Sequence, residues 1–352
     1  MYLRISIFSD RVDGRYCWRF FVWSIVLFTA LSAFAQEPPL ISGAAGFLSS
    51  TNGGVTSLQP VIAPVAVVPL GSHFLVESRA DLRGFYQEKN GTGSYEGQFF
   101  ASLEYLQLDY VVAPRVTLTA GRFLTPFGTY NERLTPIWIR NFQDSPLIFP
   151  IGTRTTGSSD GIMLRGVAVS TNAVQVNYVG YFSVASTISQ FKAARSAGDR
   201  IGVFFPSKRL ELGTSYGRFL QDEHYNSVGI DLWWQPWRVP LQVRSEYGHG
   251  PHAQGYWLEA AYRLSQLGGA NSWIGRAEPV FRMQQVFRSS PGQGDSLPGV
   301  DTQQADFGLD YHLPNEIRLN TSYSRLFAST GNRNIWNISL TYRLLFPAWR
   351  GH

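Results

Sequence analysis

The sequence predicts an all-β fold, a transmembrane antiparallel up-and-down β-barrel of about 16 strands, with roughly 14 to 18 fitting the same pattern. Ribbons of alternating apolar and polar residues recur along most of the chain. No helical pattern of comparable quality could cover their apolar faces, and no membrane-length apolar run follows the N-terminal segment. A closed barrel needs no cover because lipid takes up the apolar face. An array of soluble β-sandwiches is the alternative.

Composition supports the barrel and limits other functions. The chain has 34 Gly, 24 Phe, 17 Tyr and 10 Trp, an aromatic content that suits strands with a lipid-facing side. The net charge of +5 includes no concentrated basic stripe, so no nucleic-acid partner is expected. Cys17 is the one cysteine and lies near the N-terminus, which excludes disulfides and thiolate metal sites from the remainder.

Residues 1–35 have the features of a secretory signal peptide. Arginines precede the apolar run 20–30, and Ala33-Phe34-Ala35 provides a small-x-small cleavage site. A membrane-spanning helix is the alternative, but the run is shorter than the about 20 residues that a span needs. Residues 36–352 are then the predicted barrel.

The first two strands, expected near 41–49 and 55–70, have the least regular pattern. Pro60, Pro64 and Pro69 argue against a regular hydrogen-bond ladder there, because proline donates no backbone hydrogen bond.

The next two strands follow, over 73–86 and 98–112. Apolar and polar residues alternate regularly along the first. The second changes phase, since Glu104 and Gln107 fall on opposite faces of a regular strand. A β-bulge near Tyr105-Leu106 would return both to one face.

The later strands alternate more regularly. The clearest are 173–182, 239–248, 256–264, 273–287, 304–313 and 334–346. Short turns between strands alternate with longer polar connections, as periplasmic turns and outer loops do in outer-membrane barrels. Aromatic residues near strand ends are expected to face the lipid interface: Trp233, Trp234, Trp336, Tyr342 and Phe346.

The charged residues of the polar faces are expected to face a water-filled lumen. An arginine facing lipid at mid-bilayer would cost about 2–4 kcal/mol. The pore-lining candidates are Glu77, Arg79, Asp81, Arg83, Arg244, Glu246, Arg276, Glu278 and Arg282. Acidic and basic residues are nearly balanced among the inward positions, so most of them are expected to pair across strands and stiffen the wall.

The longest connection, 124–160, is the candidate functional segment. It is rich in proline and aromatic residues, which would be an aggregation hazard if fully exposed. Folded inward, it would narrow the pore. Its constriction candidates are Glu132, Arg133, Arg140, Asp144 and Arg154. An external lid or a contact between the subunits of a trimer is the alternative.

A family resemblance rests on the residues around this connection. Gly121-Arg122-Phe123-Leu124-Thr125-Pro126-Phe127-Gly128 is similar to a "GQFKTPFG"-like motif, and Asp160-Gly161-Ile162-Met163-Leu164-Arg165-Gly166 to an "RDIGVQLSG"-like motif. With Arg140-Asn141-Phe142 and Phe149-Pro150 between them, the segment resembles the phosphate-selective porin O/P family. That family's selectivity rests on a lysine ladder. Lys89, Lys192 and Lys208 are the lysines here, so the phosphate site does not carry over.

The resemblance implies a 16-stranded outer-membrane porin with an inward loop, expected to form a homotrimer. The expected function is passive diffusion of small hydrophilic solutes or ions, in the outer membrane of a Gram-negative-type bacterium. Outer-membrane lipids and the barrel-assembly machinery, through the C-terminal strand, are the other expected partners. A plugged structural or binding barrel is the alternative.

No catalytic or metal site is expected, and no cofactor is implied. His249 and His252 flank a Gly-Pro pair, but no third ligand is evident. No nucleophile elbow, Walker motif or HExxH occurs. A lipid-modifying barrel enzyme with a Ser-His pair is the less favoured alternative, because such residues meet in space rather than in sequence.

Overall fold

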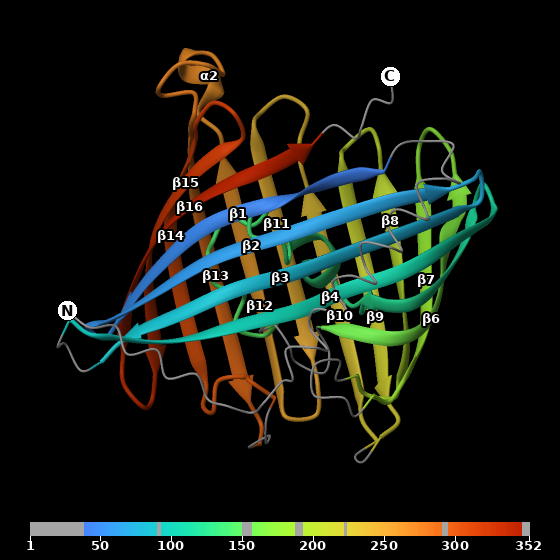
Figure 1. Cartoon of the computed structure of the whole chain (residues 1–352), viewed down its shortest axis with the longest axis horizontal. Helices are drawn as coiled ribbons and strands as arrows, with labels where there is room; N and C mark the ends of the chain where they lie inside the picture. The colour runs from blue at the N-terminus through green and yellow to red at the C-terminus, as the bar shows by residue number, and fades with distance from the viewer. Residues whose placement is uncertain are drawn as a thin grey trace, which may run out of the picture.

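The computed structural model describes residues 39–89, 93–149, 157–186, 193–221, 224–290 and 295–346. Within these ranges, 16 antiparallel strands follow one another in chain order and close into a barrel, with β1 pairing to β16 (Figure 1). The predicted fold class and strand number are confirmed. The predicted signal peptide, residues 1–35, and the tail 347–352 lie outside the described residues.

The strands are β1 (Leu40–Asn52), β2 (Val55–Leu70), β3 (Phe74–Glu88), β4 (Tyr95–Ala113), β5 (Val116–Leu124), β6 (Ser158–Ser170), β7 (Gln175–Val184), β8 (Ser196–Phe205), β9 (Leu210–Phe219), β10 (Asn226–Trp234), β11 (Leu241–His249), β12 (Ala253–Tyr262), β13 (Ala277–Arg288), β14 (Thr302–His312), β15 (Ile317–Ala328) and β16 (Arg333–Phe346). One π-helical turn, η1 (Tyr130–Leu134), follows β5, and one helical turn, α2 (Ser265–Gly268), lies between β12 and β13. No helix among the described residues is long and apolar enough to cross a membrane, a result that concerns helices alone.

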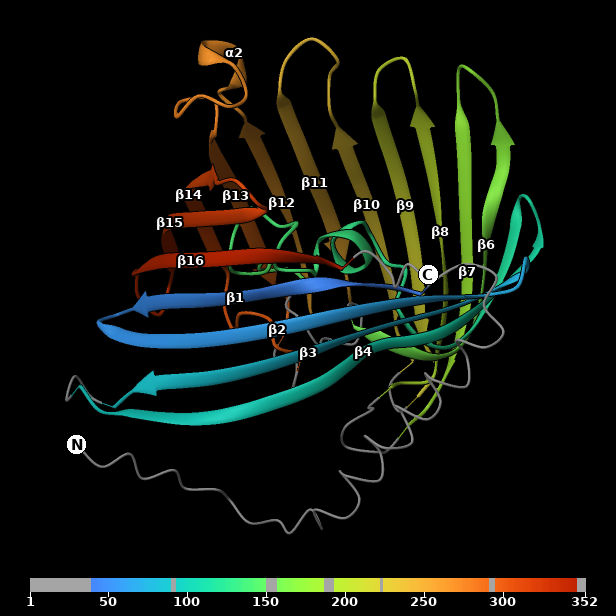
Figure 2. The ribbon, with the colours of Figure 1, turned by 45° about the horizontal axis from the view of Figure 1, so that its top comes forward.

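The two ends of the barrel differ. The start of β1 pairs with the end of β16, Ile41 opposite Phe346, and this end also carries α2 (Figure 2). The even-to-odd connections from β2–β3 onward lie at the same end, and most of them are short. The 33-residue connection between β5 and β6 leaves from the other end. By the usual arrangement of such barrels, the end with the short turns is periplasmic.

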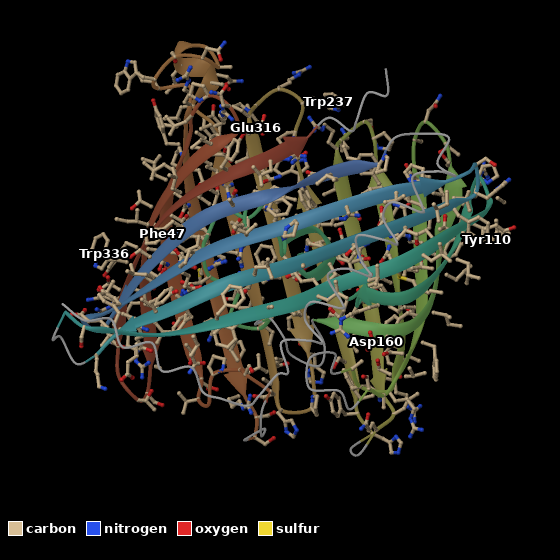
Figure 3. The ribbon with its side chains drawn as sticks, viewed as in Figure 1. Phe47, Tyr110, Asp160, Trp237, Glu316 and Trp336 are labelled. Carbon is tan, nitrogen blue, oxygen red and sulfur yellow. The ribbon has the colours of Figure 1, made fainter. Side chains whose placement is uncertain are left out.

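Alternation along the strands places polar residues inside and apolar residues outside. On β10, Asp231 is buried and its neighbour Ile230 is 58% exposed. On β13, Arg282 is buried beside the exposed Phe281. Trp336 of β16 is also 58% exposed and lies on the outer surface (Figure 3). The outer face of the wall is therefore apolar and suited to lipid.

The prolines of β2 affect one of its two ladders. β1 and β2 pair continuously, but the β2–β3 register has no partner for Pro60 or Pro64. This is the irregularity that the sequence predicts, since each proline removes a backbone donor.

β4 contains the predicted bulge and has an unpaired edge. Arg79 lies opposite Tyr105 and Ala80 opposite Leu103, so Glu104 is the extra residue, one position before the predicted pair. β4 pairs with β5 from Leu106 onward only. Its first half has β3 on one side and no strand on the other among the described residues.

Candidate functional site: a loop that crosses the lumen

The connection between β5 and β6 folds into the barrel, as the sequence predicts. Residues 125–149, the green segment inside the barrel in Figures 1 and 2, form the inward loop. Asn131 holds the two ends of the β5–β6 connection together, because its Nδ2 donates to Thr125 O at 2.8 Å and to Gly157 O at 2.9 Å. The connection is thus closed at its base.

Glu246 of β11 anchors the first half of the inward loop. Its Oε1 accepts hydrogen bonds from the backbone N–H of Thr129, from Thr129 Oγ1 at 2.7 Å and from the backbone N–H of Tyr130 at 2.6 Å. Its Oε2 accepts one from Trp257 Nε1 at 3.3 Å. A buried carboxylate with this number of donors is well satisfied, and charge-assisted bonds of this kind are among the stronger ones.

Gly128 makes this approach possible. Its φ is +66°, a left-handed conformation that favours glycine. A Cβ at this position would lie 2.7 Å from Glu246 Oε1, and its N–H donates to Ser215 Oγ at 3.0 Å. The glycine of the Pro126-Phe127-Gly128 motif therefore lets the chain turn against the wall.

Three phenylalanines of the inward loop lie directly over glycines of the wall. The distances from each ring to the position a Cβ would occupy are Phe127 to Gly229, 2.9 Å; Phe142 to Gly308, 2.9 Å; and Phe149 to Gly248, 2.8 Å. All three rings are 3% exposed. The missing side chains leave room for the rings, so loop and wall are complementary in shape.

The middle of the inward loop reaches the opposite wall. Ile137 packs with Ala44 and Leu48 of β1 and Val61 of β2, and Trp138 lies against this cluster. Because Glu246 lies on β11, the loop spans the lumen rather than following one side of it.

The loop then returns along β15. Arg318 donates to Ile137 O at 2.9 Å and to Arg140 O at 2.6 Å. Asn320 Nδ2 donates to Asn141 O at 2.6 Å. These bonds satisfy loop carbonyl groups that have no strand partner.

Contacts with two further strands, β13 and β16, hold the final stretch. The carbonyl oxygen of Asp144 accepts a hydrogen bond from Arg282 Nη1 at 3.0 Å, and its carboxylate accepts one from Asn337 Nδ2 at 2.9 Å. Arg282 also lies over the Phe142 ring, with its Cζ 4.6 Å from the centroid. Leu147 N–H donates to Gln284 Oε1 at 2.8 Å.

Two cavities remain on the side of the short turns. The β3–β8 cavity has a volume of about 550 Å³, with Glu132 and Arg133 of the inward loop facing Arg165 and Arg200 of the wall. The β12–β16 cavity, of about 600 Å³, lies between Trp138 of the loop and the turns that follow β12 and β14.

The constriction candidates occupy different places. Glu132 and Arg133 line the β3–β8 cavity, where Arg133 makes two bonds to Glu211, of 2.6 and 2.9 Å. Arg140 is buried, and Asp144 is held by the wall. Arg154 lies outside the described residues.

Glu132 lies in the inward loop, outside the strands. Desolvation within the barrel raises its pKa above the ordinary value, and the nearby Arg165, Arg200 and Arg133 oppose that rise. Its carboxyl group therefore loses its proton at a higher pH than that of an exposed glutamate.

The pore-lining candidates all belong to inward-facing sets, but several are covered. Arg79, Arg244, Glu246 and Arg282 are at most 3% exposed. Glu77 lines the β3–β8 cavity and Arg276 the β12–β16 cavity. The remaining candidates, all half-buried, are Asp81, Arg83 and Glu278.

Ion pairs connect many of these groups. Those with a candidate in the pair are Arg79–Glu104, Arg83–Asp81 (2.8 Å), Arg244–Glu259 (2.6 Å), Arg282–Asp306 (2.8 Å) and His312–Glu278 (2.8 Å). All but Arg83–Asp81 join different strands. In each pair, the positive and negative charges of the two side chains offset one another at that place on the wall.

The structure corrects the position of Trp233. Both Trp233 and Trp234 are predicted from the sequence to face lipid, but adjacent strand residues point to opposite sides. Trp233 shares the inward face with Asp231. Its ring lies 5.8 Å from Arg133 Cζ and 5.4 Å from Arg244 Cζ. The alternation around Asp231 is the signal that identifies it.

Glu211 is not among the residues predicted from the sequence, although it binds both Arg133 and Arg200. Arg200 also pairs with Asp231 at 2.7 Å. Alternation along β8, β9 and β10 puts Arg200, Glu211 and Asp231 on the inward face. Whether the three side chains meet depends on the register of the strands, which the sequence does not show.

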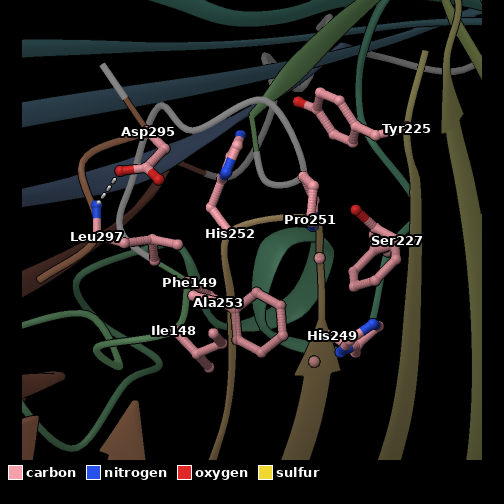
Figure 4. A pocket seen from close by; sticks show the side chains of 13 residues that line it. Ile148, Phe149, Tyr225, Ser227, His249, Pro251, His252, Ala253, Asp295 and Leu297 are labelled. Carbon is pink, nitrogen blue, oxygen red and sulfur yellow. Dashed lines mark hydrogen bonds between the residues drawn. The ribbon is translucent and has the colours of Figure 1, made fainter. Parts of the chain in front are cut away.

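A smaller pocket lies toward the outer loops (Figure 4). Its volume is about 70 Å³, and Phe149 of the inward loop, Tyr225, Ser227, His252 and Leu297 are among its lining residues. Within the described ranges, no group of three or more His, Cys, Asp or Glu side chains could hold a metal ion.

Comparisons with known proteins agree on the fold. No protein-family model matches the sequence, and no curated protein does. Among solved structures, OprB of Pseudomonas putida at high pH aligns with a TM-score of 0.58 at 10% identity, over 90% of this chain and 96% of that one. The anion-selective porin of Comamonas acidovorans aligns with a TM-score of 0.57 at 10% identity, over 87% of this chain and 99% of that one. OccK7 (OpdD) of Pseudomonas aeruginosa aligns with a TM-score of 0.52 at 10% identity, over 89% of this chain and 100% of that one. The chain has the fold of 16-stranded outer-membrane barrels.

Proposed function

We propose that this protein is an outer-membrane porin, through which small hydrophilic solutes or ions diffuse passively. The observation that carries the proposal is the inward loop, which crosses the lumen and yet leaves cavities of about 550 and 600 Å³ on its inner side. A closed wall with an apolar outer face supports a position in the outer membrane. The name of one structural neighbour, an anion-selective porin, points the same way.

The proposed path runs along β3–β8. There the inward loop presents Glu132 and Arg133, and the wall presents Glu77, Arg165 and Arg200. On the β15 and β16 side, by contrast, the loop is bonded directly to the wall. Glu132 and Arg133 would set the size and the local field of the passage.

The other sequence-predicted charges have supporting positions in this proposal. Arg244, Glu246 and Arg282 hold the wall and the loop instead of contacting solute, while Asp81, Arg83, Arg276 and Glu278 line wider parts of the lumen. Arg140 and Asp144 fix the loop, and Arg154 is proposed to belong to the same constriction.

Several finer points rest on the resemblance of residues 121–166 to phosphate-selective porins. We propose export by cleavage after Ala35, insertion by the barrel-assembly machinery through β16, and a homotrimer in the outer membrane. Selectivity for phosphate itself has no support from the lysine content.

Single-channel recording of the refolded mature protein tests the proposed function. Discrete conductance steps are expected, and the reversal potential in a KCl gradient gives the sign of the preferred ion. Folded barrels that show no conductance would refute the porin and favour a plugged barrel.

A further inference from the structure

The two inner cavities differ in how their positive charge is compensated. Arg115, Arg133, Arg165 and Arg200 line the β3–β8 cavity together with two glutamates. Three of these arginines are paired: Arg133 with Glu211, Arg165 with Asp109, and Arg200 with Glu211 and Asp231. Little free positive charge is left there.

The β12–β16 cavity keeps more of its positive charge. Its lining includes Arg263, Arg276, Arg318 and Arg343, with the carboxylate of Glu316. Behind the lining, Asp310 pairs with Arg318 at 3.6 Å, and Glu278 is bonded to His312 at 2.8 Å. Glu316 is exposed on the turn between β14 and β15 (Figure 3). Guanidinium groups around this space of about 600 Å³ that have no carboxylate partner repel one another unless an anion joins them.

The arginines of this cavity also have free donors. Arg276 and Arg343 have no ion-pair partner among the described residues. Arg263 uses Nε for Gly275 O at 3.1 Å, and Arg318 Nε is buried without a hydrogen-bond partner. A guanidinium fork suits the two oxygens of a carboxylate or phosphate, whereas hydrated chloride cannot bind it bidentately.

Part of the cavity lining is apolar. Trp138 and Ile139 of the inward loop line it. Ile139 is 41% exposed, and Trp138 is half-buried. An apolar body attached to the anionic group would cover these side chains and remove them from water.

The cavity is a recess and not a straight passage. On its outer side, Arg318 binds the carbonyl groups of Ile137 and Arg140, and Asn320 binds that of Asn141. The inward loop is thereby bonded to β15, so a ligand reaches the recess from the side of the short turns.

We propose that the β12–β16 cavity is a binding site for a small organic anion, with a carboxylate or phosphate held by Arg276 and Arg343 and an apolar portion against Trp138. The inference rests on the proposed function only for the periplasmic direction of the opening. Occupancy would place negative charge beside the loop without filling the β3–β8 path.

Calorimetric titration of the intact refolded protein with benzoate tests the site, with benzyl alcohol as the neutral probe and inorganic phosphate as the anion without an apolar body. We expect benzoate to bind more tightly than either. The double variant Arg276→Gln, Arg343→Gln should weaken benzoate binding by at least about tenfold, since two charge-assisted contacts are lost. Trp138→Leu should weaken binding of benzoate but not of phosphate.

Arg115→Gln is the matched control, because it removes one arginine from the β3–β8 cavity. Benzoate affinity should be unchanged in it. Equal benzoate binding in the double variant and the unmodified protein, or no binding at all, would overturn the site. So would benzyl alcohol binding as tightly as benzoate. Phosphate binding as tightly as benzoate would refute the contribution of Trp138. Conductance recorded on the same samples separates these outcomes from failure of the porin itself.

Discussion

The anchoring of the inward loop by Glu246 leads to the sharpest prediction. Glu246→Ala removes the acceptor of the Thr129 and Tyr130 backbone donors and of the Thr129 hydroxyl. The hydroxyl can turn to another partner, but two buried N–H groups are left unsatisfied at about 1–3 kcal/mol each. The attached state of the first half of the loop should lose about 4 kcal/mol, a shift of nearly a thousandfold in its equilibrium with a detached state.

The second half of the loop should stay in place in this variant, because Arg318, Arg282 and Asn337 bind it independently. We therefore expect a wider and noisier passage rather than loss of the loop. Single-channel recordings should show higher conductance with flicker, and trypsin should cleave after Arg133, which is paired in the unmodified protein.

Glu278→Gln is the control, since Glu278 is an inward carboxylate that pairs with His312 and does not contact the loop. It should alter ion preference without adding flicker. If folded Glu246→Ala barrels gave the conductance and noise of the unmodified protein, the anchoring role would be wrong.

Three further predictions follow from the loop. Gly229→Val should displace the Phe127 ring and lower the thermal midpoint, as monitored by heat-dependent gel migration, whereas Gly180→Val, where a Cβ meets nothing within 4 Å, should not. Arg318→Gln should release residues 137–140 of the inward loop from β15, because each lost charge-assisted hydrogen bond removes about 1.5–3 kcal/mol of attachment free energy. The single-channel conductance should then increase, and an unchanged conductance would contradict the prediction. As pH rises through the raised pKa of Glu132, the residue gains negative charge, so the anion-to-cation permeability ratio from reversal potentials should fall. Glu132→Gln should remove that step, and a step that persists would assign it to another group.

Much of the wall could be predicted from local pattern. Period-two alternation identified the inward sets, because facing lipid or water is decided residue by residue along a strand. The change of phase around Glu104 located the bulge to within one position, and the prolines of β2 marked the broken ladder. These features depend on a few neighbouring residues only.

The site itself was less accessible from sequence. Alternation predicts an inner position for Arg244, Glu246 and Arg282, but nothing local shows that the loop that packs over this part of the wall lies more than 90 residues away in the chain. The glycine positions under the phenylalanine rings are equally non-local. Gly229 looks like any strand glycine until the path of the loop is known.

The unpaired edge of β4 fixes where the protein can sit in a bilayer. Backbone N–H and C=O groups cannot be left without partners in hydrocarbon. Before Leu106, β4 has no neighbour opposite β3 among the described strands, although Arg122 reaches the carbonyl of Leu103. The outer limit of the lipid tails therefore lies near Leu106 on this side, unless another chain covers the edge. The nine residues of β5 span the layer below it, about the length that a tilted transmembrane strand needs.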